Sequence, residues 1–145
     1  MPTIANKLLK QITLFAENKP GRLASVTRIL SKNGINIRAF TIADSGEFGI
    51  IRLVVDDADA SLRHLRRAGF TVSETKVIGL EMPDTPGALF EISRALSAND
   101  INVDYAYAYS SATPKKAILI LQVSDLKKAV GLLTELRFHL IEASP

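Results

Sequence analysis

The chain contains the same short unit twice. Asn18-Lys19-Pro20-Gly21-Arg22-Leu23 recurs as Asp84-Thr85-Pro86-Gly87-Ala88-Leu89, and Gly34-Ile35-Asn36-Ile37 recurs as Asp100-Ile101-Asn102-Val103. Both pairs of segments are 66 residues apart. Phe70 and Phe138, later in the copies, are 68 apart, which predicts one small insertion in the turn between Ser110 and Lys116. A repeat of this length in 145 residues predicts two small domains instead of one larger domain.

The repeat also sets the domain boundaries. We expect a lead-in over residues 1–10, a first domain over 11–75 and a second over 76–145. Domains of about 65 residues bury only about 60% of the surface that their unfolded chains expose. We therefore expect the two domains to pack side by side through strands, and the molecule to form a homodimer.

Hydrophobic periodicity predicts the same elements in both copies. Ile12, Leu14 and Ala16 alternate with other residues as in a half-buried strand, whereas Leu23, Val26 and Leu30 form one face of a helix. The order is βαββαβ in each copy, with later strands at 35–43, 50–55 and 70–72 and then at 78–82, 101–109, 118–123 and 138–141. The expected class is α+β: two ferredoxin-like units, each an antiparallel sheet with both helices on one face.

Residues suited to catalysis are few. His64 lies in an arginine-rich helix and His139 in a closing strand, and neither has the spacing of a metal site or a hydrolytic triad. The chain has no cysteine and no phosphate or dinucleotide fingerprint. The sequence predicts a protein that is not an enzyme and that uses no metal and no cofactor.

Charge and hydropathy limit the partners. The net charge is +3, and the densest basic group, Arg63, Arg66 and Arg67, has helical spacing that favours a solvated helix face over a phosphate site. No apolar run approaches the roughly 18 residues of a membrane span. Residues 1–6 lack the basic start and apolar middle of a signal peptide. We expect a cytoplasmic protein without membrane or nucleic-acid partners.

The repeated polar positions are the candidate binding residues. Asn18 and Asp84 precede helix starts, where each side chain can cap the first turn or the free amides can hold a carboxylate. Gly21 and Gly87 give the backbone room for close approach to a ligand. Asn36 and Asn102 stand where a helix turns into the second strand, and asparagine there commonly hydrogen-bonds its own loop. We expect the two loops to lie at one end of the sheet and to suit a small zwitterion.

These motifs resemble the ACT domain, the amino-acid-sensing module of many biosynthetic enzymes. The resemblance covers both copies almost completely, as in stand-alone tandem ACT proteins. It implies effector binding at interfaces between units, by the loop after the first strand and the start of the second. Carried over by position, the ligand-binding residues are Asn18, Gly21 and Asn36 in the first copy and Asp84, Gly87 and Asn102 in the second.

The sequence departs from the family pattern in two respects. Ala16 and Met82 stand where some members have a polar side chain, often histidine, which favours a more apolar pocket than a serine site. No catalytic domain is present in the 145 residues, so any regulation must act on a separate protein.

Two surfaces could meet a partner. Ile118 and Ile120 lie on the side of their strand opposite to Leu119 and Leu121, which suggests contact with another layer or chain. Tyr105, Tyr107 and Tyr109 form an alternating stripe that serves either sheet packing or a ligand or partner platform.

Two alternative functions remain open. The chain could be the regulatory subunit of a separately encoded enzyme of amino-acid metabolism. It could also bind RNA, because the RNA-recognition motif shares the βαββαβ order. Glu47-Phe48-Gly49-Ile50-Ile51-Arg52-Leu53 matches that motif's third strand only superficially, with Ile50 and Leu53 where aromatic residues should stack on bases.

Overall fold

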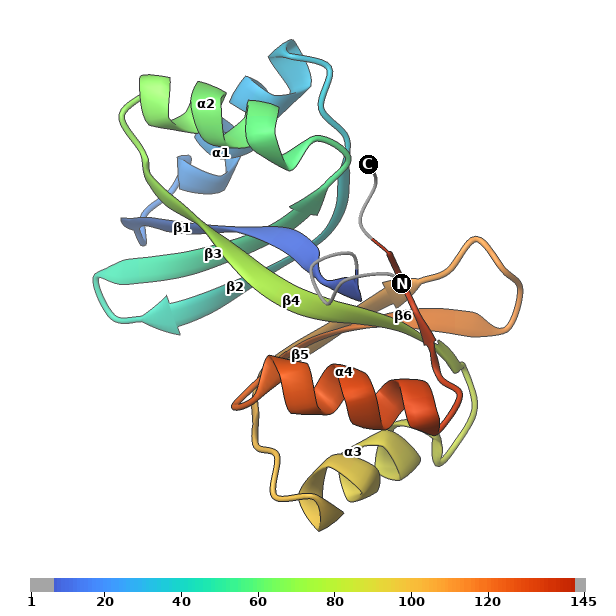
Figure 1. Ribbon diagram of the computed structural model, residues 1–145. Coiled ribbons are helices and arrows are strands. Elements are labelled where there is room, and N and C mark those ends of the chain that lie inside the picture. The colour runs from blue at the N-terminus through green and yellow to red at the C-terminus, as the bar shows by residue number, and fades with distance from the viewer. Residues whose placement is uncertain (1–6, 143–145) are drawn as a thin grey trace. The chain divides into compact units, whose positions relative to one another are not determined.

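The computed structural model describes residues 7–142, and these form two compact units. The N-terminal unit is Lys10–Thr75. Of the described residues, the C-terminal unit joins 76–142 with 7–9, near the start of the chain. Each unit is antiparallel sheet with two helices on one face, as Figure 1 shows, so the expected α+β ferredoxin-like class is confirmed.

The N-terminal unit follows the predicted order. Its elements are β1 (Leu9–Glu17), α1 (Arg22–Lys32), β2 (Ile37–Ser45), β3 (Phe48–Val55), α2 (Ala58–Arg67) and the first part of β4 (Thr71–Pro83). The strands are arranged β2-β3-β1-β4, which is the split βαβ arrangement. Its core lies between sheet and helices and includes Ile12, Leu14, Leu30, Leu53 and Leu65, all fully buried.

The C-terminal unit repeats this arrangement. The second part of β4 is followed by α3 (Ala88–Ala98), β5 (Val103–Ser110), β6 (Lys116–Val123), α4 (Leu126–Glu135) and the short β7 (His139–Leu140). Its strands lie in the order β7-β4-β6-β5. The inserted residues lie in the β5–β6 turn, at 111–115, whereas Gly46 and Glu47 alone join β2 to β3.

The closing strand of one copy and the opening strand of the next are a single strand. The sequence predicts separate strands at 70–72 and 78–82, but β4 runs without interruption from Thr71 to Pro83. Residues 73–77, Ser-Glu-Thr-Lys-Val, contain no glycine or proline to break an extended chain. The prediction of two strands is therefore wrong at this point.

Both faces of β6 are buried. Leu119 and Leu121 belong to the core beneath the helices, whereas Ile118 and Ile120 lie outside that cluster and are 5% and 0% exposed. Ile120 lies opposite Gly79 on β4, and a Cβ on Gly79 would be 2.5 Å from Cδ1 of Leu9. Leu9, at the end of the lead-in, therefore lies against this face of the sheet beside Gly79.

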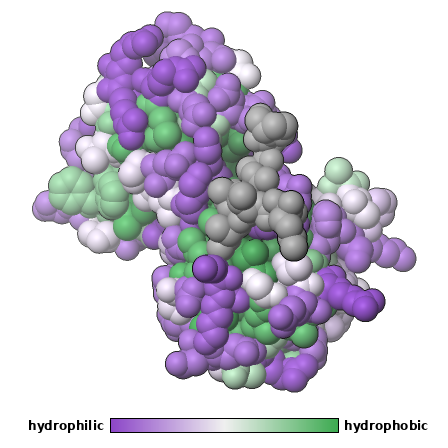
Figure 2. Space-filling model, viewed as in Figure 1, coloured by the Kyte–Doolittle hydropathy of each residue, from purple (hydrophilic) through white to green (hydrophobic). Residues whose placement is uncertain are grey.

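Each unit also exposes apolar side chains. In the N-terminal unit, Phe15, Phe40, Ile42 and Phe48 are 47–56% exposed. The space-filling view in Figure 2 shows a hydrophobic area over the end of this unit where β2 turns into β3. In the C-terminal unit, Leu89 and Phe90 at the start of α3 are exposed.

The tyrosine stripe lies on the edge strand β5. Tyr105, Tyr107 and Tyr109 are half-buried and alternate with exposed alanines. Tyr107 pairs with Ile120 and Tyr109 with Ile118, so these side chains share the sheet face that points away from the helices. The contacts favour sheet packing for at least part of the stripe.

Candidate functional site

The loops after β1 and β4 are attached to neighbouring turns through their backbones. The amide of Asn18 donates to the carbonyl oxygen of Glu47 at 2.8 Å, and that of Asp84 donates to Lys115 at 2.8 Å. The Asn18 side chain also donates to Asp44 Oδ1 at 3.2 Å and to the carbonyl of Gly46 at 3.3 Å. Asn18 thus fixes the β1–α1 loop to the β2–β3 turn.

The helices after these loops begin at glycines. Gly21 and Gly87 are the N-cap residues, with φ of 91° and 89°, and no side chain caps either helix. The predicted capping by Asn18 and Asp84 is wrong, because the Pro-Gly turn separates them from the helix start. A Cβ on either glycine would meet nothing within 4 Å. The left-handed backbone, and not close approach of another backbone, is what favours glycine here.

At the starts of the second strands, the main-chain atoms of the two asparagines hydrogen-bond to Asp56 and to Ser124. The Asn36 amide donates to Asp56 Oδ1 at 3.1 Å, and the Asp56 amide donates to the Asn36 carbonyl at 3.1 Å. Asn102 makes the equivalent pair with the hydroxyl and amide of Ser124, both at 2.9 Å. The asparagine side chains are therefore not what closes these loops.

The two asparagine side chains have different surroundings. Nδ2 of Asn102 donates to Asp104 Oδ1 at 3.0 Å. The side chain of Asn36 makes no hydrogen bond to any residue within 7–142 and instead borders a hollow of about 470 Å³ with Thr27, Ser31 and Gly34. A more apolar hollow of about 270 Å³ shares Thr27 and Ile37 with it.

The two candidate loops of one unit do not meet. Asn18 is bonded beside the end of β2 at Ser45, whereas Asn36 directly precedes its start at Ile37. The nine residues of β2 are joined by eight steps of about 3.3 Å, which separates these ends by roughly 26 Å. The expectation that both loops lie at one end of the sheet is wrong, since α1 carries the chain back along the sheet between them. Loops from the same unit cannot hold one small ligand.

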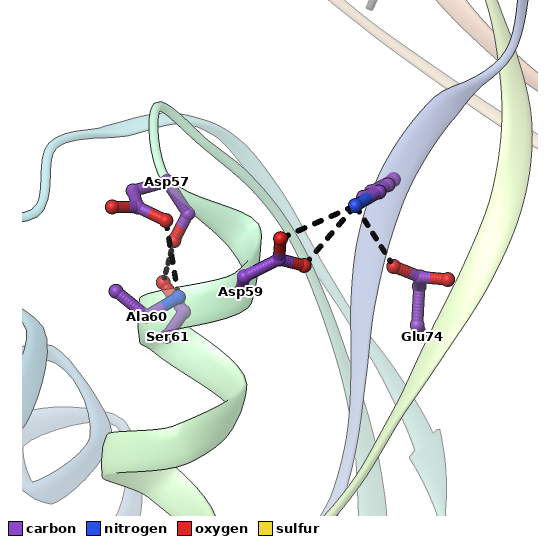
Figure 3. Close-up of polar contacts among 6 residues, drawn as sticks. Asp57, Asp59, Ala60, Ser61 and Glu74 are labelled. Atoms are coloured by element: carbon purple, nitrogen blue, oxygen red, sulfur yellow. Dashed lines mark hydrogen bonds and ion pairs between the residues drawn. The ribbon is translucent and has the colours of Figure 1, made fainter. Parts of the chain in front are cut away.

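Ion pairs lie beside the β1–α1 loop and at the start of α2. Glu17 pairs with Lys19 at 3.2 Å and with Arg22 at 3.3 Å, and the Lys19 hydrogen bond is the main reason that the pKa of Glu17 lies below its ordinary 4.5. Lys10 donates a hydrogen bond to Asp59 at 3.1 Å and lies 3.8 Å from Glu74, and Figure 3 draws the contacts of both carboxylates as dashed lines. The hydrogen bond to Asp59 is the main cause of the raised pKa of Lys10. These side chains are exposed or only half-buried, so the pairs contribute little to stability.

The remaining sequence candidates are placed as follows. Asp57 caps α2 by accepting from the amide of Ala60 at 3.0 Å (Figure 3). Arg63, Arg66 and Arg67 are exposed on the solvent side of α2.

Within residues 7–142, no group of three histidine, cysteine or acidic residues could hold a metal ion. No described helix is long and apolar enough to cross a membrane.

Sequence reasoning missed two charged residues near the start of β2. Arg38 borders the apolar hollow, and Asp56 touches the Asn36 amide. A comparison of the two copies could have identified both residues, because the matching positions of the second copy differ in charge: Asp104 matches Arg38, and Ser124 matches Asp56.

Comparison with known proteins gives a consistent result. The family described as an ACT domain pair matches residues 7–144. The structure of protein BT0572 from Bacteroides thetaiotaomicron is 35% identical, with a TM-score of 0.89, over 97% of this chain and 95% of that one. No curated protein matches.

More distant solved structures share the fold. The regulatory subunit of aspartate kinase from Thermus thermophilus is 16% identical, with a TM-score of 0.63, over 90% of this chain and 95% of that one. The corresponding subunit from Thermus flavus is 17% identical, with a TM-score of 0.60, over 87% and 90% of the two chains.

Proposed function

Because the chain belongs to the ACT domain pair family, we propose that it is a non-catalytic regulatory protein that binds a small amino acid. The observation that carries the proposal is the hollow of about 470 Å³ beside Asn36. Its lining includes the hydroxyls of Thr27 and Ser31 and the backbone at Gly34, which can bind a zwitterion. The hollow is shallow and open to solvent, so it suits a small polar ligand that stays partly exposed.

The repeat extends the proposal to the family positions. Asn18, Gly21 and Asn36 in the first copy, and Asp84, Gly87 and Asn102 in the second, are the positions that the ACT pattern assigns to effector sites. Asn18 and Asn36 of one unit lie too far apart to contact the same ligand. Of these, we give Asn36 the leading role because it borders a hollow and has no competing side-chain bond among the described residues.

An enzyme partner is the second part of the proposal. The two regulatory subunits of aspartate kinase that share this fold support the alternative that the chain serves a separately encoded enzyme. We place it in the cytoplasm as a homodimer, which light scattering at micromolar concentration tests. Capture of a stoichiometric enzyme from native extract would favour the subunit role, and its absence a free-standing sensor.

A thermal-shift screen of the common amino acids tests ligand binding. A ligand that binds only the folded protein stabilises it by about 2.7 kcal/mol at a hundred times its Kd. Asn36→Ala should weaken binding of the amino acid found by roughly tenfold to a hundredfold, because it removes a hydrogen bond to a charged group. Asn102→Ala is the matched variant in the other copy. If neither change alters binding, the family-derived positions are wrong for this chain.

RNA binding is the alternative from another class. It predicts salt-sensitive binding of single-stranded RNA, since phosphate contacts release counterions. Arg63→Ala with Arg66→Ala should change nothing under the amino-acid proposal. Tight RNA binding by the parent protein would overturn that proposal.

A further inference from the structure

We propose that only the N-terminal unit binds the ligand, and that the ligand is an α-amino acid with an apolar side chain. Arg38 binds its carboxylate, Asp56 beside Asn36 binds its ammonium group, and the hollow under Phe40 takes its side chain. The inference rests on the proposed function and adds to it the site, the stoichiometry and the class of amino acid.

The charges around the start of β2 match a zwitterion. Arg38 borders the 270 Å³ hollow, and no ion pair joins it to another residue in the part of the chain that the structure describes. Asp56 holds the Asn36 amide through Oδ1 at 3.1 Å and is itself exposed. Asn36 lies two residues before Arg38 in the chain, so a cation and an anion lie near the start of β2, where the two hollows share Thr27 and Ile37. These opposite charges match the two charges of a small zwitterion.

The sheet geometry brings Arg38 into this position. β2 pairs with β3 in an interrupted register, because Ile37 lies opposite Val55 whereas Ala39 lies opposite the adjacent Val54. Arg38 is the extra residue of this bulge. Bulges redirect the side chain of the additional residue and are frequent beside functional sites.

The apolar hollow suits a hydrocarbon side chain. Leu23, Phe40 and Leu53 line it, and Leu23 and Phe40 are 36% and 54% exposed. Burying such surface against a ligand is favourable by about 25 cal/mol per Å². The hollow of about 270 Å³ is small, so it favours one aliphatic or thioether side chain.

The same positions in the C-terminal unit have the wrong charges for a carboxylate. Asp104 replaces Arg38 at an identical bulge, and Ser124 replaces Asp56. Asp104 also accepts the side-chain hydrogen bond of Asn102 at 3.0 Å. Ala106 replaces Phe40, which removes the aromatic wall. A zwitterion there would meet a carboxylate without its cation, and like charges repel.

Calorimetry and thermal shift test the proposal with L-leucine, L-isoleucine, L-valine and L-methionine as probes. L-serine tests the need for an apolar side chain, and 3-methylbutan-1-amine, which is leucine without its carboxylate, tests the need for the anion. We expect one site per chain for at least one apolar amino acid and no binding of the amine. Arg38→Ala should weaken binding roughly tenfold to a hundredfold, Arg38→Lys less, and Asp56→Asn should also weaken it.

Asp104→Asn is the matched control and should leave affinity and stoichiometry unchanged. Melting without ligand should be the same for all these exposed substitutions, which separates loss of binding from loss of folding. Two sites per chain, unaltered binding by Arg38→Ala, or stronger binding of L-serine would each overturn the inference while amino-acid binding itself stands. If no common amino acid shifts the melting of the parent protein, the proposed function fails and the inference fails with it.

Discussion

Single residues in left-handed backbone distinguish the two copies. Gly34 ends α1 with φ of 70°, and Asp100 ends α3 with φ of 59°. The following hydrogen bonds are the same, because Ile35 donates to Leu30 and Ile101 donates to Leu96, both at 2.9 Å. The sequence predicts both helix ends. It also predicts that the end of α3 is less stable than the end of α1, since a residue with a side chain is strained in this backbone region.

Exchange of these two residues measures that cost. Asp100→Gly should raise the free energy of unfolding by roughly 0.5–1 kcal/mol, because the left-handed backbone no longer strains a Cβ. The reciprocal change, Gly34→Asp, should lower it by a similar amount. Urea denaturation of both variants provides the measurement. Destabilisation by Asp100→Gly would show that the Asp100 side chain has a favourable role that outweighs its strain.

The candidate site could be predicted from sequence only in part, for reasons that also lie at single residues. The repeat identifies Asn36 and Asn102 as equivalent, but it does not show which side chain is already bonded. That depends on Asp104 in one copy and Arg38 in the other, which a comparison of charges between the copies would have found. The direction of the Asn18 side chain depends on a turn that is distant in sequence.

At the level of elements, the order of helices and strands follows from hydrophobic periodicity, and the boundaries follow less well. The repeat assigns the two halves of β4 to different copies, so they are predicted as two strands. In the structure they form one strand, because no glycine or proline separates them. The four helices begin in two different ways. α1 and α3 begin at glycines, whereas α2 and α4 begin at Asp57 and Asp125, whose side chains accept amide hydrogen bonds at 3.0 Å.

The aspartate caps predict a measurable difference between helices. Asp57→Ala and Asp125→Ala should each lower the free energy of unfolding by about 0.5–2 kcal/mol, because a first-turn amide loses its acceptor. Asp57→Asn should be nearly neutral, since asparagine also caps. Chemical denaturation of the three variants measures these effects. If Asp57→Ala is as stable as the parent, the hydrogen bond to Ala60 does not contribute to stability.

For the whole molecule, the division of the chain does not follow its order. The repeat treats residues 1–10 as a lead-in, yet residues 7–9 group with the C-terminal unit. Leu8 is 8% exposed within a core that also includes Ile78, Leu96 and Leu121. Lys7 pairs with Glu142 at 2.8 Å in the same unit. No local pattern indicates this, because the contacts join residues more than 60 positions apart.

Removing the Leu8 side chain should therefore destabilise the unit that is distant in sequence. Leu8→Ala deletes buried methyl groups and leaves a cavity, which should cost about 2–3 kcal/mol. Hydrogen exchange should become faster in β6 and α4, while β3 and α2 keep their protection, because local stability follows the packing of each unit. Leu14→Ala, in the core of the N-terminal unit, is the matched control and should give the opposite pattern. Equal acceleration in both units after Leu8→Ala would mean that Leu8 does not stabilise the C-terminal core selectively.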